Sequence, residues 1–166
     1  DKKDIGHHIS HQFDANLEDL RTRVLTMGGM VEHQISDAVT ALCDADAELA
    51  ERVITNDYRV NAQEVAIDEE CTTVLARRQP AAGDLRLIVA VIKTITDLER
   101  IGDQAERIAR MAVRLTEERA DTKYTVALRH MGEHVQRMLH DTLDAFARMD
   151  PEAAVAAARK DIKADS

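Results

Sequence analysis

The chain of 166 residues has no tryptophan, only two tyrosines and two phenylalanines, and only two prolines. Few of its residues therefore favour strands, and few break helices. The remaining composition is dominated by Ala, Leu, Glu, Arg and Asp, which is typical of long packed helices. The sequence predicts an all-α protein, and its length suits one ordinary domain.

The sequence also lacks the marks of several other protein classes. Its formal net charge is −9, without the clustered Lys and Arg that phosphate contacts need, so we expect no binding to nucleic acid. No apolar run reaches the roughly 18–20 residues of a membrane span, and no secretory signal is visible. Cys43 and Cys71 have no metal-type or redox spacing, and we predict that both are small buried side chains in a reducing cytoplasm.

Apolar residues at steps of three and four predict four successive helices. The first is predicted to follow Ser10 as its N-cap, and the second to start near Asp46. The breaker-rich segment RQPAAGD (78–84) predicts a turn, with Asp84 as the N-cap of the third helix. The fourth begins near residues 117–121, with an apolar stripe that starts at Tyr124, as the stripe of the third starts at Leu85.

The fourth predicted helix resembles the first at a shift of 104 positions, where ALCDADAELA (41–50) aligns with AFARMDPEAA (145–154). This similarity predicts an internal repeat. We assign a long antiparallel three-helix bundle to residues 10–120, and the first helix and part of the second helix of another copy to residues 121–166. Because this second copy breaks off at Ser166, we expect either a truncated chain or a disordered remainder.

Two pairs of acidic residues, each four positions apart, touch the apolar stripes: Glu64 with Asp68, and Glu99 with Asp103. Like charges at this spacing weaken an isolated helix by roughly 0.2–0.5 kcal/mol. Counted from a turn centred near Ala82, Glu64 and Glu99 stand at nearly the same height in an antiparallel hairpin. All four carboxylates then fall within roughly 10 Å along the helix axis.

Converging carboxylates are costly to desolvate unless a positive charge neutralises them. A multivalent cation would do so, and oxygen ligands suit hard ions such as Mg²⁺, Ca²⁺ and Mn²⁺, as well as iron. Asp57 and Asn61 continue the polar ribbon, and Glu32 is a further possible ligand, although a surface position is favoured for it. An ordinary solvated acidic face is the alternative for the whole set. Gly28 and Gly29 interrupt the first helix, which indicates a kink or a close helix contact.

Three segments of the chain resemble the PhoU family of phosphate-signalling regulators: NAQEVAIDEEC (61–71), LARRQPAAGDLRLI (75–88) and DLERIGDQAERIA (97–109). The resemblance covers the first family repeat and the opening of the second. It implies two repeats, each a three-helix bundle, with paired E(D)xxxD motifs that bind iron, manganese or magnesium. Here these motifs are Glu64 with Asp68 and Glu99 with Asp103, and the family's second motif pair lies beyond Ser166.

The resemblance also implies a cytoplasmic negative regulator of phosphate uptake and of the phosphate-starvation response. Its partners would be the ATPase subunit of the phosphate ABC transporter and the sensor histidine kinase of the phosphate regulon, and it would reach the membrane only through them. The apolar stripes of two incomplete halves predict exposed apolar surface, and we therefore expect self-association as a homodimer.

Two other functions fit the same residues. One is a carboxylate-bridged di-metal enzyme, either an oxidase or a hydrolase. The sequence has no Glu-x-x-His of the ferritin-like diiron type, no glycine-rich phosphate loop and no G-x-S-x-G elbow, so we expect no enzymatic activity. The other is a purely structural coiled-coil adaptor, in which removing Glu64 and Glu99 would leave function intact or raise stability.

Overall fold

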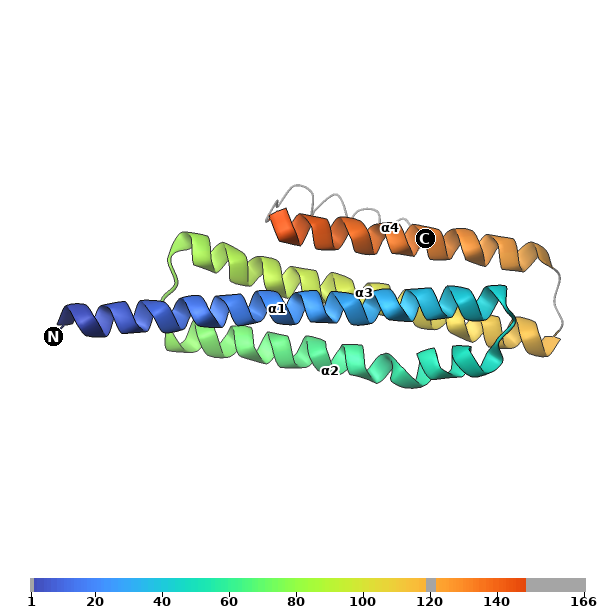
Figure 1. The fold of residues 1–166 in the computed structure, drawn as a ribbon, viewed down its shortest axis with the longest axis horizontal. Helices are drawn as coiled ribbons and strands as arrows, with labels where there is room; N and C mark the ends of the chain where they lie inside the picture. Colours follow the sequence, from blue (N-terminus) through green and yellow to red (C-terminus); the bar gives the residue numbers. More distant parts are fainter. Residues whose placement is uncertain (1, 119–121, 149–166) are drawn as a thin grey trace.

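The computed structural model describes residues 2–118 and 122–148, except for the side chains of residues 7–10 and 122. These residues form four α-helices: α1 (Lys2–Cys43), α2 (Ala47–Arg77), α3 (Ala82–Glu118) and α4 (Thr122–Arg148) (Figure 1). They contain no strand, so the predicted all-α class is confirmed. The predicted second helix of the second copy falls in residues 149–166, outside the described residues.

The helices form one elongated bundle (Figure 1). α1, α2 and α3 each contact the other two, while α4 contacts α1 and α3 but not α2. α4 therefore covers the groove between α1 and α3 on the side away from α2. None of the described helices carries an apolar stretch that could cross a lipid bilayer.

The core follows the predicted stripes on α1 and α2 but only in part on α3, where the buried Leu98, Ile101 and Ile108 lie beside the predicted stripe. Fully buried aliphatic side chains recur on the first three helices at steps of three and four, among them Leu20, Val24, Met27, Val31, Ile35, Ile67, Ile88, Ile95, Leu98, Ile101 and Ile108. The predicted stripes begin too early on α3 and α4. Their first members, Leu85 and Tyr124, are 43% and 61% exposed. Each lies in the first turns of its helix, at an end of the bundle, where periodicity continues but the covering helices do not.

Two predicted helix starts are wrong. α1 begins at Lys2, so Ser10 lies inside the helix, and α3 begins at Ala82, so Asp84 lies in its first turn. Ser and Asp are tolerated inside helices as well as at caps, so they do not by themselves mark a boundary. Asp46 does cap α2, because its side chain accepts a hydrogen bond of 3.0 Å from the backbone N–H of Leu49.

The two cysteines have different environments. Cys71 is buried, as predicted, and burial, assisted by the charges of Asp68 and Glu70, raises the pKa of its thiol to about 11. Cys43 is exposed, which contradicts the prediction, because it is the last residue of α1 and its side chain falls outside the packing stripe.

α1 and α4 approach each other closely at two glycines. A Cβ on Gly28 would lie 2.7 Å from a methyl carbon of Leu143, and a Cβ on Gly132 would lie 2.6 Å from a methyl carbon of Val39. Gly28 therefore serves a close helix contact, one of the two predicted interpretations. Gly28 and Gly132 are separated by the same 104 positions that separate Val39 and Leu143. The two contacts are thus equivalent under the shift that defines the predicted repeat, whose boundaries stay a prediction.

Gly132→Val should destabilise the protein by about 1–3 kcal/mol, because a side chain at this position overlaps Val39, which is branched at Cβ and adapts poorly. Gly29→Val is the matched control, since a Cβ at Gly29 meets no atom within 4 Å. Chemical denaturation followed by circular dichroism measures both. Val39→Ala should recover part of the loss in the Gly132→Val background, and a Gly132→Val protein as stable as the control would contradict this account of the contact.

Candidate metal centre

A row of acidic side chains follows the seam between α2 and α3. It consists of Asp57, Glu64 and Asp68 from α2, and Glu99, Asp103 and Glu106 from α3. The spacings of three, four and seven residues keep each set on one side of its helix. Because α2 and α3 are antiparallel neighbours, the two sets converge along the seam.

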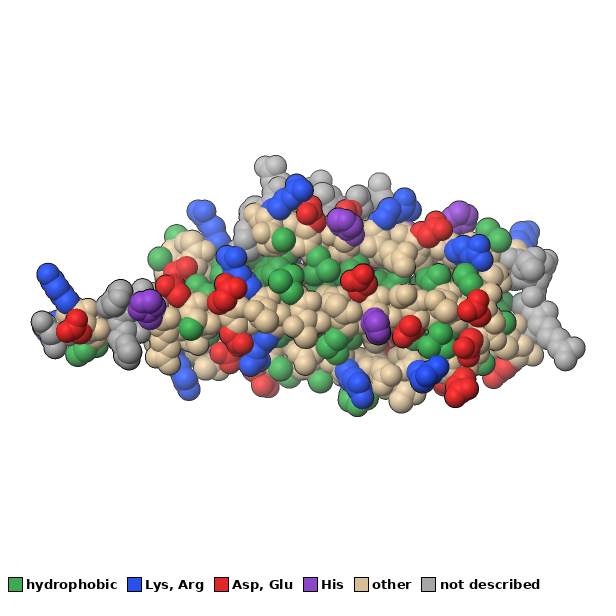
Figure 2. All heavy atoms as spheres, viewed as in Figure 1, with side chains coloured by type: hydrophobic (Ala, Val, Ile, Leu, Met, Phe, Trp, Pro, Cys, Tyr) green, Lys and Arg blue, Asp and Glu red, His purple; other side chains and the backbone are tan. Residues whose placement is uncertain are grey.

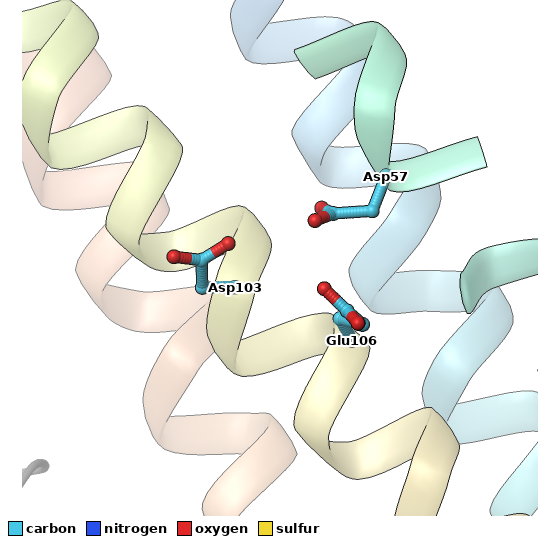
Figure 3. A group of neighbouring side chains, drawn as sticks. All are labelled: Asp57, Asp103 and Glu106. Atoms are coloured by element: carbon cyan, nitrogen blue, oxygen red, sulfur yellow. The ribbon is translucent and has the colours of Figure 1, made fainter. Parts of the chain in front are cut away.

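Asp57, Asp103 and Glu106 form the most compact part of this row (Figure 3). Each offers one carboxylate oxygen, and these three oxygens lie within 4.8 Å of one another. Figure 3 shows Asp57 and Glu106 pointing toward each other across the seam, with Asp103 beside them on α3. Asp57 is only 7% exposed, whereas Asp103 and Glu106 are half-buried.

Gln34 is the residue of α1 that contacts this acidic group. It is 7% exposed, and its Nε2 lies 3.4 Å from Oδ1 of Asp57. Its Oε1 is buried and has no hydrogen-bond partner among the described residues. This oxygen faces the backbone of α3, since a Cβ on Gly102 would lie 3.2 Å from it. Because Gly102 has no side chain, Oε1 of Gln34 fits at the edge of the acidic group. Leaving such a buried acceptor without a hydrogen bond costs free energy.

The Asp57 and Glu106 carboxyl groups lie close enough to influence each other's pKa. Burial and the neighbouring Glu106 carboxylate raise the pKa of Asp57 to about 6. Burial alone would raise the pKa of Glu106, but the neighbouring Asp57 carboxyl group and the charge of Arg110 outweigh it and lower that pKa. Nε of Arg110 donates to Oε1 of Glu106 at 2.8 Å. Of the two carboxyl groups, Asp57 therefore has the higher pKa and is protonated first as the pH falls.

Glu64, Glu99 and Asp103 interact farther along the seam. Burial, a hydrogen bond with Asp103 and the charges of Asp103 and Glu64 raise the pKa of Glu99 to about 7. Burial and the charges of Asp68 and Asp103 raise the pKa of Glu64. The negative charge of Asp103 thus acts on both Glu64 and Glu99, as expected for carboxylates that converge.

The structure brings three of the four predicted ligands, Glu64, Glu99 and Asp103, to the inner part of the seam. Asp68 is exposed, at the outer edge beside Glu64. Glu32 is also exposed, and it lines a groove toward α4 instead of the seam. The ligand set as a whole stays a prediction, because proximity among acidic residues does not by itself demonstrate binding.

Sequence reasoning missed Glu106 and Gln34. Glu106 could have been found, because it lies three residues after Asp103 and matches Asp57 in height as Glu99 matches Glu64. Gln34 carries no such signal. Its place among stripe residues of the first helix is recognisable only once α1 is docked against α2 and α3.

The donor set fits a hard cation. Oxygens bound to one ion at about 2.0–2.6 Å lie no more than about 5 Å apart, which matches the group of Asp57, Asp103 and Glu106. Beside this group, the buried Oε1 of Gln34 is a neutral oxygen of the kind that such ions accept. With no histidine or thiolate in the group, the donor chemistry favours Mg²⁺, Mn²⁺ or iron over Zn²⁺.

Comparison with known proteins identifies the family of this fold and seam. A family model described as the PhoU domain matches residues 24–112, which span the seam, the second half of α1, all of α2 and most of α3. The chain belongs to the PhoU family. Its PhoU domain thus contains all six acidic residues of the seam and Gln34.

The relatives of this PhoU chain are similar over nearly its whole length. It is 51% identical to the phosphate-specific transport system accessory protein PhoU homolog of Pseudomonas aeruginosa over 99% of this chain and 68% of that protein. It is 52% identical to PhoU of Escherichia coli K12, with the same coverage. The crystal structure of PhoU from Pseudomonas aeruginosa superimposes with a TM-score of 0.80, at 51% identity, over 92% of this chain and 73% of that one. The phosphate transport system regulatory protein PhoU from Streptococcus pneumoniae superimposes with a TM-score of 0.75, at 33% identity, over 91% and 70%.

Proposed function

We propose that this chain is a cytoplasmic, metal-binding regulator of phosphate transport. In this proposal it acts as a helical adaptor between the ATPase subunit of the phosphate ABC transporter and the sensor histidine kinase of the phosphate regulon. It lowers phosphate uptake and the starvation response when phosphate is plentiful, and it works as a homodimer without an enzymatic activity of its own.

One observation carries the regulatory part of this proposal: relatives that are 51–52% identical over 99% of the chain are named accessory proteins of the phosphate-specific transport system. The relative from Streptococcus pneumoniae is likewise titled a regulatory protein. These names designate accessory and regulatory proteins, which favours an adaptor over the di-metal enzyme.

The metal part of the proposal is supported by the acidic seam. Glu64, Asp68, Glu99 and Asp103 are its proposed ligands, joined by Asp57 and Glu106 at the compact end. The ion is Mg²⁺, Mn²⁺ or iron. By neutralising the seam, it would hold α2 and α3 in one arrangement and so fix the surface that the partners contact.

A complementation assay tests the adaptor role. In Escherichia coli lacking its 52% identical relative, we expect the chain to restore repression of a phosphate-responsive reporter in phosphate-rich medium. Glu64→Ala combined with Glu99→Ala should abolish most of this repression, because the ligands on both helices are lost. Glu51→Ala combined with Glu117→Ala is the matched control, since both residues are exposed and lie outside the seam, one on each helix.

If the wild-type chain did not repress the reporter, this result would contradict the adaptor role. Full repression by the Glu64→Ala, Glu99→Ala protein would contradict the metal part of the proposal and leave the regulatory part standing. The chain would then be a regulator that needs no metal, as in the structural-adaptor alternative. Immunoblotting for equal protein levels ensures that lost repression does not reflect lost protein.

A further inference from the structure

A groove of about 490 Å³ lies between α1 and α2. Residues of Thr26–Asp37 line it from α1, and residues of Leu49–Val60 line it from α2. Its apolar surface includes Met30 and Val53. Figure 2 shows this face of the molecule, with a histidine over α1 and basic side chains over the adjoining part of α2.

The charged side chains that line the groove are two arginines and one aspartate, in a chain whose net charge is −9. Arg52 and Arg59 line it from α2, and Asp37 is the one carboxylate among its lining residues. Both arginines lie on the same side of α2, seven residues apart, with the amide of Asn56 between them. This separation corresponds to about 10 Å along the axis, although the long side chains can converge.

Neither arginine of the groove forms an ion pair with an acid among the described residues. Elsewhere Arg23, Arg110 and Arg148 each pair with a carboxylate four residues earlier, the ordinary arrangement on a helix surface. Within the described residues, Arg52 forms no such pair, although Glu48 lies four residues before it. Arg59 lies beside the ring and hydroxyl of Tyr58, its own neighbour, and a phenol does not cancel its charge.

We propose that this groove binds a phosphorylated small molecule of nucleotide size. Arginine guanidinium groups pair with phosphate oxygens through two parallel hydrogen bonds, so Arg52 and Arg59 would hold the phosphate groups. Asn56 and His33 would donate to or accept from polar atoms of the ligand. Met30 and Val53 would support its organic body. A volume of about 490 Å³ lies within the usual range of small-molecule sites, roughly 300–1,000 Å³.

The groove and the acidic seam share a wall. Gln34 lines the inner side of the groove, and its amide nitrogen contacts Asp57 in the seam. The ligand class, however, follows from the groove alone, so this proposal does not rest on metal binding or on the regulatory role.

Isothermal titration calorimetry of the chelator-treated protein with ADP tests the proposal. We expect saturable binding of ADP, with weaker binding of pyrophosphate and of adenosine, because each lacks one half of the ligand. Arg52→Ala combined with Arg59→Ala should weaken ADP binding about ten- to a hundredfold. Arg129→Ala combined with Arg137→Ala is the matched control, since both are exposed on α4 and lie outside the groove.

Gly29→Leu provides a second test that leaves the charges intact. Gly29 lines the groove, and a Cβ there meets no atom within 4 Å, so a leucine side chain starts in open space and would extend into the volume that the ligand needs. We expect a folded protein, verified by its thermal melt, that no longer binds ADP. Three results would overturn the proposal: no saturable binding of ADP at millimolar concentration, an affinity for ADP that both variants retain, or pyrophosphate bound as tightly as ADP.

Discussion

Saturating Mn²⁺ is expected to raise the Tm of the metal-free protein by roughly 8–16 °C at pH 8, and by much less at pH 5. A ligand at about a thousand times its Kd stabilises the folded state by about 4 kcal/mol. For a chain of this size, each kcal/mol shifts the Tm by about 2–4 °C. Protons compete with the ion at pH 5, because the pKa of Asp57 is about 6 and that of Glu99 about 7.

The metal-free protein should lose stability as the pH rises from about 4 to about 7. The pKa values of Asp57 and Glu99 are raised above the ordinary 3.8 and 4.5, so in this window the folded state binds more protons than the unfolded chain. The free energy of unfolding therefore falls with pH, and the contribution of these groups is fully present only below about pH 4. The lowered pKa of Glu106 acts in the opposite direction, but only below its ordinary value of 4.5.

Thermal melts with and without Mn²⁺, at pH 5 and pH 8, measure both effects. Asp103→Asn should diminish the metal shift and the pH dependence together, because the charge of Asp103 acts on Glu64, Glu99 and Asp57. Glu117→Gln, an exposed change on the same helix, should alter neither. A metal-free protein that becomes more stable between pH 4 and pH 7 would refute the assigned role of the seam.

Gly102→Leu is expected to destabilise the protein by about 1–3 kcal/mol and to abolish the Mn²⁺ shift. A Cβ at Gly102 would lie 3.2 Å from Oε1 of Gln34, 3.4 Å from a methyl carbon of Val60 and 3.8 Å from Oδ1 of Asp57. The rest of a leucine side chain would need the space in which Gln34 and Asp57 meet. Overpacking a filled site costs about 1–3 kcal/mol, which outweighs the gain in helix propensity of up to about 1 kcal/mol.

Gly29→Leu is the control for this experiment, because the same substitution at an open position of α1 brings the propensity gain alone. Chemical denaturation should show Gly29→Leu as stable as the wild type or slightly more stable, and still responsive to Mn²⁺. If Gly102→Leu matched the control in both stability and metal response, α1 would have no part in shaping the acidic seam.

Most of the fold follows from periodicity. Stripes at steps of three and four predicted four helices and many of their buried residues, because a helix packs its apolar face against its neighbours and the apolar periodicity marks that face. On α3 several fully buried residues lie beside the predicted stripe, and the other errors lie at helix ends. Ser10 and Asp84 are good caps that the structure does not use, and Cys43 and Leu85 lie near helix termini that the neighbouring helices leave open.

The acidic seam was predictable in part for the same reason. Glu64, Glu99 and Asp103 lie on or beside stripes, and counting residues from the α2–α3 turn placed them at one height. Gln34 was not predictable, because its position depends on the rotation of α1 about its own axis relative to α2 and α3. That rotation depends on the packing of the whole core, so it cannot be predicted from any single residue.

The paired glycine contacts between α1 and α4 have a geometric consequence. Exchanging the two helices maps Gly28 with Leu143 onto Gly132 with Val39, so the pair is related by an approximate two-fold axis. Such an arrangement is isologous, the kind that normally joins two identical subunits. Here one polypeptide supplies both α1 and α4. Substitutions can therefore accumulate in one helix without changing the other, while the approximate two-fold arrangement of the pair is kept.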